Sequence, residues 1–396
     1  MSDSRRHVVV AGAGVAGLET ALALQAVARE HAWVEVIAPE DEFVYRALAV
    51  TEPFHVGEVR RFPLAPLVEA AGADLRLGAL RAVDPDEKRV ALTDGSALEY
   101  DVLVLALGAQ PLPAIPGALT FSGLPEDMAQ LGGLLEQVTT GELRRLVFAV
   151  PPASTWPLPL YELALLTGEY LAEHLTHAEL MVATPEEQPL GVFGTQASEA
   201  IAQLLDVRGI GLQTGTAPVS FEDGLLRFAN GDTVAADAIV ALPKLEGARI
   251  AGLPQDEHGF VPTDDYGRVA DLTDMYAAGD LTQSAIKQGG VAAQEADAVA
   301  EAIAADAGAP VQPSPCRPVL RGLLLTGFVP RYLRHGEGGP SIVDTQPLWW
   351  PPGKIVGRYL SPFLAEHLGL AASSTATPAH ALPVEVAVDR PTWTRV

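Results

Sequence analysis

The chain has 396 residues, 48% hydrophobic and 19% charged, so it is globular rather than disordered and long enough for two or three domains. Its 26 basic and 50 acidic residues give a net charge of −24, which opposes binding to nucleic acid or to anionic lipid surfaces. The single cysteine, Cys316, excludes a disulfide framework, a cysteine-rich zinc site, an iron–sulfur cluster and an internal redox dithiol.

The N-terminal part alternates strands and helices. Residues 8–11 are predicted to form a buried strand, residues 15–26 a helix with apolar side chains at helical spacing, and residues 34–37 a second strand. Two arginines precede the first strand, but glycines interrupt the apolar stretch too early for a secretion signal. No apolar run reaches the roughly 18 residues that cross a bilayer, so we expect a cytoplasmic protein.

A glycine motif joins the first strand to the first helix. Its sequence is Gly12-Ala13-Gly14-Val15-Ala16-Gly17. The first glycine permits a tight turn, the second lets a pyrophosphate approach the backbone, and the third lets the helix pack closely on the strand. The free N–H groups at the helix N-terminus favour the same anion. We therefore predict that Gly12, Gly14, Ala16 and Gly17 bind a dinucleotide.

The acidic residue expected after the second strand, where it would hold the ribose, is displaced. The strand is followed by Ala38-Pro39-Glu40, so Glu40 is the nearest candidate, about 20 residues beyond the glycines. Alternatively, residues 40–42 form a solvated acidic loop, and the sequence leaves both interpretations open. Arg46 and Leu80 are further candidate contacts of the cofactor.

The alternation continues along the chain and is typical of α/β domains with parallel sheets. We expect strands at residues 87–94, 102–107, 146–150, 180–183 and 275–280, a helix around residues 161–171, and a long alanine-rich helix ending near residue 304. The proline-spaced stretch 111–116 is interpreted as a domain crossing and residues 310–318 as a linker.

Two later motifs make the chain resemble a known family. Residues 100–109, Tyr-Asp-Val-Leu-Val-Leu-Ala-Leu-Gly-Ala, are similar to the second nucleotide-contacting strand and turn of flavoproteins with two dinucleotide-binding domains. Residues 276–280, Tyr-Ala-Ala-Gly-Asp, are similar to the late motif of the same flavoproteins. Together with the first glycine motif, they make residues 7–305 resemble the FAD-dependent pyridine nucleotide–disulfide oxidoreductase superfamily.

This resemblance implies an α/β fold with two interleaved Rossmann-like dinucleotide-binding domains, the glutathione reductase-like FAD/NAD(P) fold, and a C-terminal α+β cap. Residues 1–110 and 241–310 are expected to form the FAD-binding domain, residues 111–240 a second, NAD-like domain, and residues 311–396 the cap or an interface. FAD is the implied cofactor.

The resemblance also implies further cofactor contacts. Asp280 would hold the ribityl and pyrophosphate region of FAD, and Gly108, Ala109 and Gly279 would lie against the cofactor. An aspartate at a strand end can accept hydrogen bonds from sugar hydroxyls, and a purely structural cap is the alternative.

The helix after this motif is expected to open with Lys287-Gln288-Gly289-Gly290 and to run through Val299. Its N-terminus, aimed at the pyrimidine end of a flavin, would stabilise negative charge on the reduced ring. Lys287 is one of four lysines in the chain, so we favour a flavin or substrate contact over a surface role. Gln288 and Gly289 are candidate cofactor contacts.

The second β-α-β unit lacks the glycine fingerprint that binds a nicotinamide cofactor. The strand at 146–150 is followed by Pro151-Pro152-Ala153-Ser154-Thr155-Trp156-Pro157-Leu158-Pro159. Proline offers no N–H to a pyrophosphate, and no glycine lets the phosphates come close. NAD(P)H therefore lacks its usual cradle, and its use is kept as an alternative.

Several phrases resemble the sulfide:quinone reductase-like branch of the superfamily. They are Phe43-Val44-Tyr45-Arg46, Pro151-Pro152, Lys287-Gln288-Gly289 and Pro347-Leu348-Trp349-Trp350-Pro351-Pro352-Gly353-Lys354. Sulfide oxidation in that branch uses paired cysteines, but here Trp156 stands where one of them would be and Cys316 has no partner. Sulfide oxidation by the usual route is therefore not expected, and Cys316 is interpreted as a small hydrophobe rather than a nucleophile. Arg46, Trp156 and Lys287 are the candidate catalytic residues.

The stretch 317–360 differs in charge from the rest. It holds six basic residues (Arg317, Arg321, Arg331, Arg334, Lys354 and Arg358) and two acids, so its net charge is 6 − 2 = +4 and the remainder carries −28. Together with Trp349 and Trp350, these cations suit a membrane interface or a quinone-facing surface. We favour the alternative, a lid or subunit interface whose arginines pair with the acidic body.

The expected function is an FAD-dependent oxidoreductase that passes electrons from a small reduced donor to a quinone-like or other small acceptor. The alternatives are an NAD(P)H-dependent flavin reductase with an atypical nicotinamide site and a non-catalytic flavin-binding protein that serves as a redox sensor or partner module. We expect no metal site and no nucleic-acid partner. Peripheral membrane contact is not favoured, and a homodimer stays open.

Overall fold

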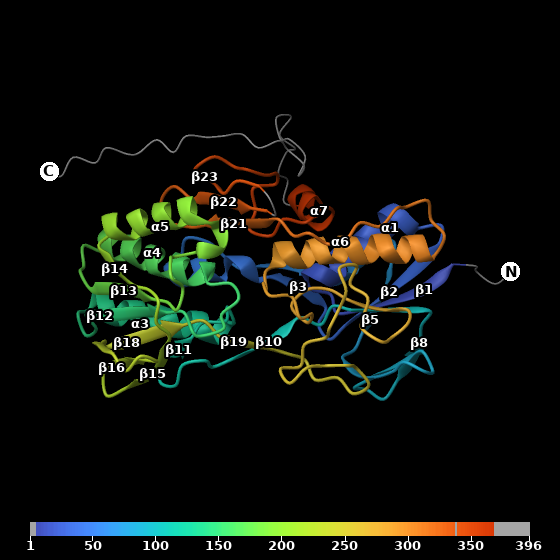
Figure 1. Cartoon of the computed structure of the whole chain (residues 1–396), viewed down its shortest axis with the longest axis horizontal. Helices are drawn as coiled ribbons and strands as arrows, with labels where there is room; N and C mark the ends of the chain where they lie inside the picture. Colours follow the sequence, from blue (N-terminus) through green and yellow to red (C-terminus); the bar gives the residue numbers. More distant parts are fainter. Residues whose placement is uncertain (1–4, 337–338, 368–396) are drawn as a thin grey trace.

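Two five-stranded parallel sheets lie side by side along the long axis of the molecule (Figure 1). The computed structural model describes residues 5–336 and 339–367. In spatial order the first sheet contains β20 (Met275–Ala277), β9 (Val102–Leu105), β1 (Arg6–Ala11), β2 (Ala32–Ala38) and β5 (Asp74–Leu77). The second contains β11 (Leu119–Thr120), β18 (Ala238–Ala241), β12 (Arg145–Ala149), β13 (Glu179–Ala183) and β14 (Ile210–Gln213).

In the first half, the sheet is covered on both faces. Val8, Val9 and Val10 of β1 are fully buried, which explains their continuous apolar run. Helices α1 (Val15–Ala28) and α6 (Gly289–Asp306) cover one face. An antiparallel sheet packs on the other; its strands are β6 (Leu80–Asp84), β7 (Arg89–Leu92) and β8 (Ala97–Glu99). Strand β20 belongs to this first sheet although it follows all strands of the second sheet in the chain. The two halves are therefore interleaved, as predicted.

The second half repeats this layering (Figure 1). Helices α4 (Leu158–Glu173) and α5 (Thr195–Val207) pack on one face of the sheet. An antiparallel sheet packs on the other, formed by β15 (Pro218–Glu222), β16 (Leu225–Phe228) and β17 (Thr233–Ala235). Strands β10 (Ala109–Leu112) and β19 (Lys244–Gly247) pair antiparallel where the chain crosses between the halves. The domain limits at residues 110 and 241 lie close to these strands and stay a prediction.

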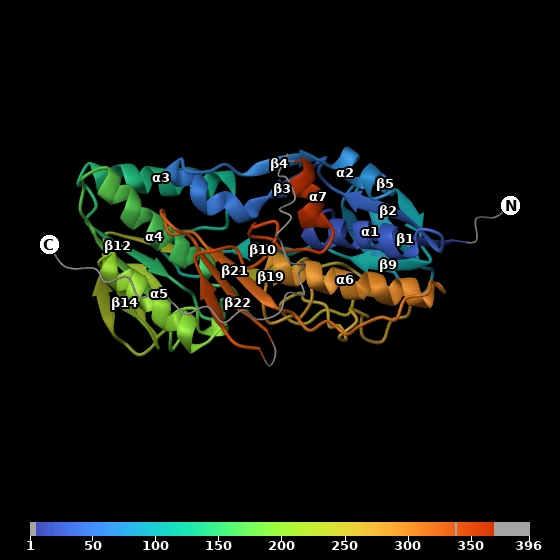
Figure 2. The ribbon, with the colours of Figure 1, turned by 90° about the horizontal axis from the view of Figure 1, so that it is seen from above.

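The C-terminal segment lies over the middle of the molecule, as the view from above shows (Figure 2). It holds an antiparallel sheet and a short helix: β21 (Leu320–Leu324), β22 (Arg331–His335), β23 (Ile342–Asp344) and α7 (Leu360–His367). Leu324 and Leu333 belong to the core of the second half, whereas Leu360 and Leu364 belong to that of the first. The predicted α+β cap is confirmed, and its part from residue 368 lies outside the described residues.

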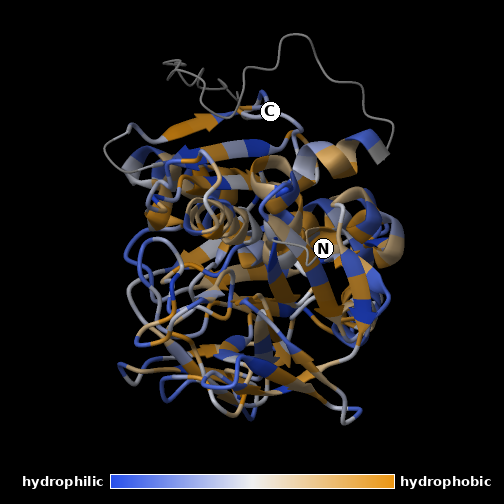
Figure 3. Ribbon diagram, turned by 90° about the vertical axis from the view of Figure 1, so that its right-hand side faces the viewer, coloured by the Kyte–Doolittle hydropathy of each residue, from blue (hydrophilic) through white to orange (hydrophobic). Residues whose placement is uncertain are grey.

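The remaining elements connect these layers. They are β3 (Glu42–Tyr45), the 3-10 helix η1 (Arg46–Phe54), β4 (Arg60–Pro63), α2 (Leu64–Ala70), α3 (Pro125–Thr139) and the 3-10 helix η2 (Gly191–Phe193). In the hydropathy-coloured view, the strands in the interior are largely hydrophobic and the outer loops are more hydrophilic (Figure 3). Within the described part of the chain, no helix is both long and apolar enough to span a membrane.

Candidate functional site

The glycine loop between β1 and α1 forms an open cradle. A Cβ at Gly17 would lie 1.9 Å from the carbonyl oxygen of Gly12, so the helix approaches the strand too closely for any side chain there. A Cβ at Gly14, in contrast, would meet no atom within 4 Å. Gly14 is the N-cap of α1, and no side chain caps the helix. Free space, bare N–H groups and the positive end of the helix dipole together fit a pyrophosphate.

The two later motifs converge on the same edge of the first sheet. They follow β9, which lies next to β1 in the sheet, and β20, which lies next to β9, so all three motifs sit beyond the carboxyl ends of three consecutive strands. Gly108 has a φ of 70° and open space around its missing Cβ. Gly279 has a φ of 80°, and a Cβ there would lie 3.0 Å from that of Ala16. The predicted residues of the three motifs are therefore brought together.

Asp280 lies at this edge with an available carboxylate. No hydrogen bond to its side chain occurs among the described residues, and burial raises its pKa while the charge of Lys287 opposes that shift. Glu295 of α6 accepts a hydrogen bond from the Gly279 N–H at 2.7 Å and so fixes the turn that presents Asp280. An unpartnered carboxylate beside an open glycine cradle fits the sugar hydroxyls and the pyrophosphate of FAD.

The structure places the candidates of α6 in protein contacts. Lys287 is buried; its ammonium donates to the carbonyl of Thr282, lies 4.1 Å from the ring centroid of Phe260 and has a pKa lowered by burial. The side chain of Gln288 caps α6 through Val291 N at 2.9 Å. A Cβ at Gly289 would lie 3.0 Å from Ile355. The helix starts at Gly289, two residues later than expected, and the roles of these three candidates stay predictions.

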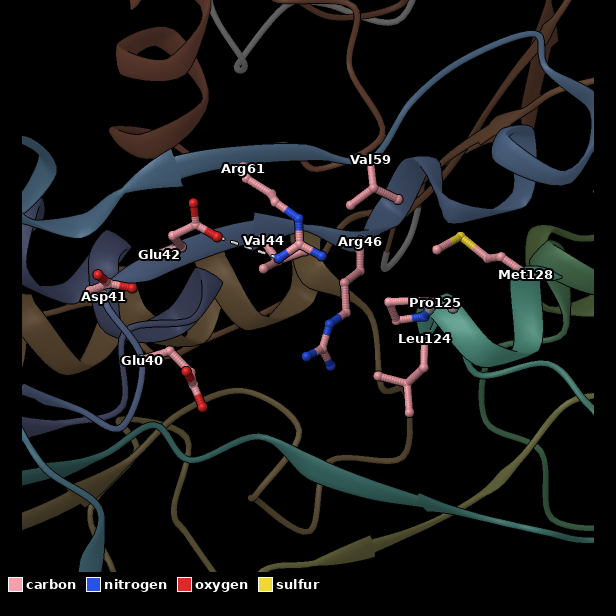
Figure 4. A pocket seen from close by; sticks show the side chains of 11 residues that line it. Glu40, Asp41, Glu42, Val44, Arg46, Val59, Arg61, Leu124, Pro125 and Met128 are labelled. Atoms are coloured by element: carbon pink, nitrogen blue, oxygen red, sulfur yellow. Dashed lines mark hydrogen bonds and ion pairs between the residues drawn. The ribbon is translucent and has the colours of Figure 1, made fainter.

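Glu40 and Arg46 share a cavity of about 240 Å³ between the two halves. In Figure 4 the Arg46 side chain extends into this cavity, which is bordered by the acidic loop 40–42 on one side and Leu124 on the other. Among the described residues Arg46 has no ion pair, whereas Arg61 and Glu42 lie 3.4 Å apart. Leu80 packs instead in the core below the first sheet. None of these placements tests the predicted roles in binding FAD.

The loop after β12 shows why a second cradle is missing. Helix α4 begins at Leu158 with Pro157 as its N-cap and Pro159 in its first turn, so proline occupies positions that elsewhere offer N–H groups. Trp156 is half-buried and packs edge-on against Phe193, with 5.6 Å between the ring centroids. The predicted degenerate fingerprint is thus a proline-rich loop braced by an aromatic pair.

An open cavity of about 800 Å³ lies beside this loop, bordered by residues 153–155, Pro157, the segment after β13, the start of α5 and residues 285–286. The Glu186 carboxylate already accepts hydrogen bonds from Tyr161 at 2.6 Å and from Thr184 at 3.0 Å, and burial raises its pKa. Glu187 is exposed. Among the described residues lining this cavity, the charged ones are both acidic, which opposes phosphate groups.

A buried ion pair that sequence reasoning missed fastens the cap to α4. Glu162 is fully buried, lies 2.5 Å from the ammonium of Lys354 and accepts the Leu325 N–H at 2.8 Å. Burial raises the pKa of Glu162, and the Lys354 charge counteracts this. In the sequence, the sign of this ion pair is that Glu162 is the one acidic residue in the apolar stretch 158–166.

Two further cations of the segment 317–360 pair with acids of the body. A guanidinium nitrogen of Arg317 lies 2.7 Å from a carboxylate oxygen of Asp265, and one of Arg358 lies 3.3 Å from a carboxylate oxygen of Glu301. With Lys354, these contacts confirm the interpretation that the segment folds back on the body. Burial raises the pKa of Cys316 to about 12, which disfavours the reactive thiolate.

A family model described as pyridine nucleotide-disulphide oxidoreductase matches residues 6–147 and 163–296. The interval that it leaves out contains the whole proline-rich loop. An NADH dehydrogenase-like protein of Mycobacterium tuberculosis is 28% identical over 299 residues, covering 69% of this chain and 72% of the relative. A demethylphylloquinone reductase of Synechocystis is 27% identical over 307 residues, covering 71% and 72%.

Among solved structures, the sulfide:quinone oxidoreductase of Aquifex aeolicus superposes with a TM-score of 0.77 at 20% identity, over 95% of this chain and 100% of the other. This likeness shows the fold, in which the cap is included.

Proposed function

Because the chain belongs to the pyridine nucleotide-disulphide oxidoreductase family, it is an FAD-dependent oxidoreductase, and we propose that it passes electrons from a small, phosphate-free donor to a quinone-like acceptor. Bound FAD supplies the two-electron chemistry, and the protein supplies binding and orientation. The open cradle at Gly14 would hold the pyrophosphate and Asp280 the sugar hydroxyls.

The observation that carries the choice of donor is the contrast between the two strand–loop–helix units. A nicotinamide dinucleotide needs a pyrophosphate site, and the loop before α4 offers prolines and neighbouring carboxylates instead. A small donor without phosphate meets no such obstacle in the cavity of about 800 Å³. The similarity to a demethylphylloquinone reductase supports a quinone-like acceptor.

An NADH-dependent reductase is the second candidate. The same cavity lies where a second dinucleotide is expected, exposed Glu187 follows β13 where a ribose-binding acid is usual, and one relative is an NADH dehydrogenase-like protein. Free Glu187 favours the ribose hydroxyls of NADH over the 2′-phosphate of NADPH.

Anaerobic bleaching of the flavin separates the candidates. The FAD-loaded protein is mixed with NADH, NADPH, sulfide or a hydroquinone, and the flavin absorbance is followed. We expect NADH and NADPH to leave the flavin oxidised, and we expect a quinone to reoxidise the flavin without oxygen after dithionite has reduced it. Rapid bleaching by NADH would overturn the proposed donor class, and failure of every quinone to reoxidise the reduced flavin would overturn the acceptor class.

A further inference from the structure

A buried glutamate in α1 holds the start of α7. Glu19 is fully buried in a helix whose other residues are mostly apolar. Its two carboxylate oxygens accept hydrogen bonds from the N–H groups of Tyr359 and Leu360, each at 2.7 Å. A Cβ at Gly357 would lie 2.4 Å from the same carboxylate, so the chain passes directly over it.

These N–H groups end a strap, residues 353–360, that runs from the N-terminus of α6 to α1. At its start, Ile355 packs on Gly289 at the N-terminus of α6 and donates its N–H to the Tyr45 hydroxyl at 3.0 Å. At its end, Leu360 enters the core of the first half. The strap therefore connects the N-terminus of α6, which lies nearest the predicted flavin contacts, with helix α1, which follows the glycine cradle.

Asp297 of α6 lies against Glu19. The two side chains share a hydrogen bond, and Oδ1 of Asp297 is buried with no hydrogen-bond partner among the described residues. Two carboxylates in contact in a buried place cannot both be ionised without strong repulsion. Glu19 receives the backbone N–H groups, so Asp297 carries the proton.

The other titratable and charged groups around the pair come from α6, the strap and the linker before β21. They are Glu301, Arg358, Tyr359 and Cys316. Arg358 is the nearby cation, but it pairs with Glu301 at 3.3 Å. Burial raises the pKa of Glu19, and burial with the Glu19 charge raises the pKa of Asp297 to about 8.

We propose that Glu19 and Asp297 share one proton and that this carboxyl pair positions the strap over the N-terminus of α6, so that loss of the proton loosens the strap. This holds whichever donor and acceptor the enzyme uses. The closed strap keeps the proton up to about pH 8, whereas carboxyl groups reached by water lose it near about pH 4. Opening therefore becomes easier as the pH rises between these values, by at most about tenfold per pH unit, and levels off above pH 8.

Amide hydrogen exchange of the FAD-loaded full chain tests this. Protection of the amides of residues 355–363, corrected for the intrinsic rate at each pH, is expected to fall at least about tenfold from pH 6 to pH 8. Asp297→Asn keeps a donor toward Glu19 but cannot ionise, and its protection should change by less than about twofold over that range. Glu301→Gln, which removes the charged partner of Arg358 and leaves both carboxyl groups of the pair in place, should keep the wild-type slope.

Equal slopes in the wild type and in Asp297→Asn would overturn the proposal, as would a wild type without a slope. If Asp297→Asn does not fold, the infrared band of a protonated buried carboxyl group in the wild-type protein decides. It should disappear as the pH rises through about 8, and its absence at pH 6 would overturn the proposal. None of these measurements depends on turnover, so they are independent of the proposed function.

Discussion

In both halves of the molecule, a central strand of a parallel sheet runs into a loop and then into a helix covering that sheet. The first loop leaves open space at Gly14 and bare N–H groups at the start of α1. The second replaces the glycines with prolines, and the acid after β13 is already bonded to Tyr161. The layering is thus kept in both halves while the dinucleotide cradle is kept in one, so the architecture alone does not tell which cofactor a half binds.

The difference carries over to what α4 does. In the first half, the start of the helix faces open space. In the second half, α4 carries Glu162, which forms an ion pair with Lys354 of the cap. The second half therefore serves partly as the anchor of the C-terminal segment. Three substitutions, from the largest expected effect to the smallest, test this difference between the halves.

Replacing Gly14 with leucine should abolish FAD retention. The backbone at Gly14 is extended, with φ −79° and ψ −165°, so leucine fits the fold but fills the space of the pyrophosphate. Flavin absorbance of the purified protein measures the loss. The matched control is Gly132→Leu in α3, where a Cβ also meets no atom within 4 Å. Unchanged flavin content in Gly14→Leu would show that the cradle binds something else.

Replacing Lys354 with methionine should lower the free energy of unfolding by about 3 kcal/mol, because it leaves Glu162 buried without its counter-ion. Urea denaturation at pH 7 measures this, and adding Glu162→Gln should recover much of the loss. Lys244→Met removes an exposed pair with Glu246 and should cost less than about 0.5 kcal/mol. Equal losses in the two lysine variants would contradict an anchoring role for the buried pair.

Replacing Tyr161 with phenylalanine should have the smallest effect, a loss of about 1–2 kcal/mol in unfolding free energy, because one hydrogen bond to a charged group disappears. The same variant frees one side of Glu186. We expect that titration with NADH still shows no binding, since the prolines before α4 remain. Binding of NADH to this variant but not to the wild type would show that Tyr161, rather than the loop, closes the second site.

The sequence predicted the first half of the site better than the rest, for a physical reason. A glycine cradle is local: its turn, its close helix–strand contact and its open space are set by a few neighbouring residues, and they appear as a short motif. The pairs Glu162–Lys354 and Glu19–Leu360 join residues 192 and 341 positions apart, and no local pattern links them. In the sequence, the sign of each pair is a single acidic residue within an apolar stretch of a helix, Glu19 in α1 and Glu162 in α4.

Lys287 shows how a local interpretation can miss its surroundings. In the sequence this residue stands out because lysine is rare and because it precedes a helix start. The structure turns its ammonium to a backbone carbonyl and to the ring of Phe260, which lies 27 positions earlier in the chain. The cavity shared by Glu40 and Arg46 was likewise not predicted, because part of its wall comes from α3.

The pairing of β20 with β9 makes completion of the first sheet wait for a strand that is synthesised late. All strands of the second sheet precede β20 in the chain, and the turn that carries Asp280 follows β20 directly. A nascent chain of which only the N-terminal strands have emerged from the ribosome already contains the glycine cradle. It does not yet contain Asp280. Firm capture of the cofactor therefore belongs to the late stages of synthesis, after the second half has emerged.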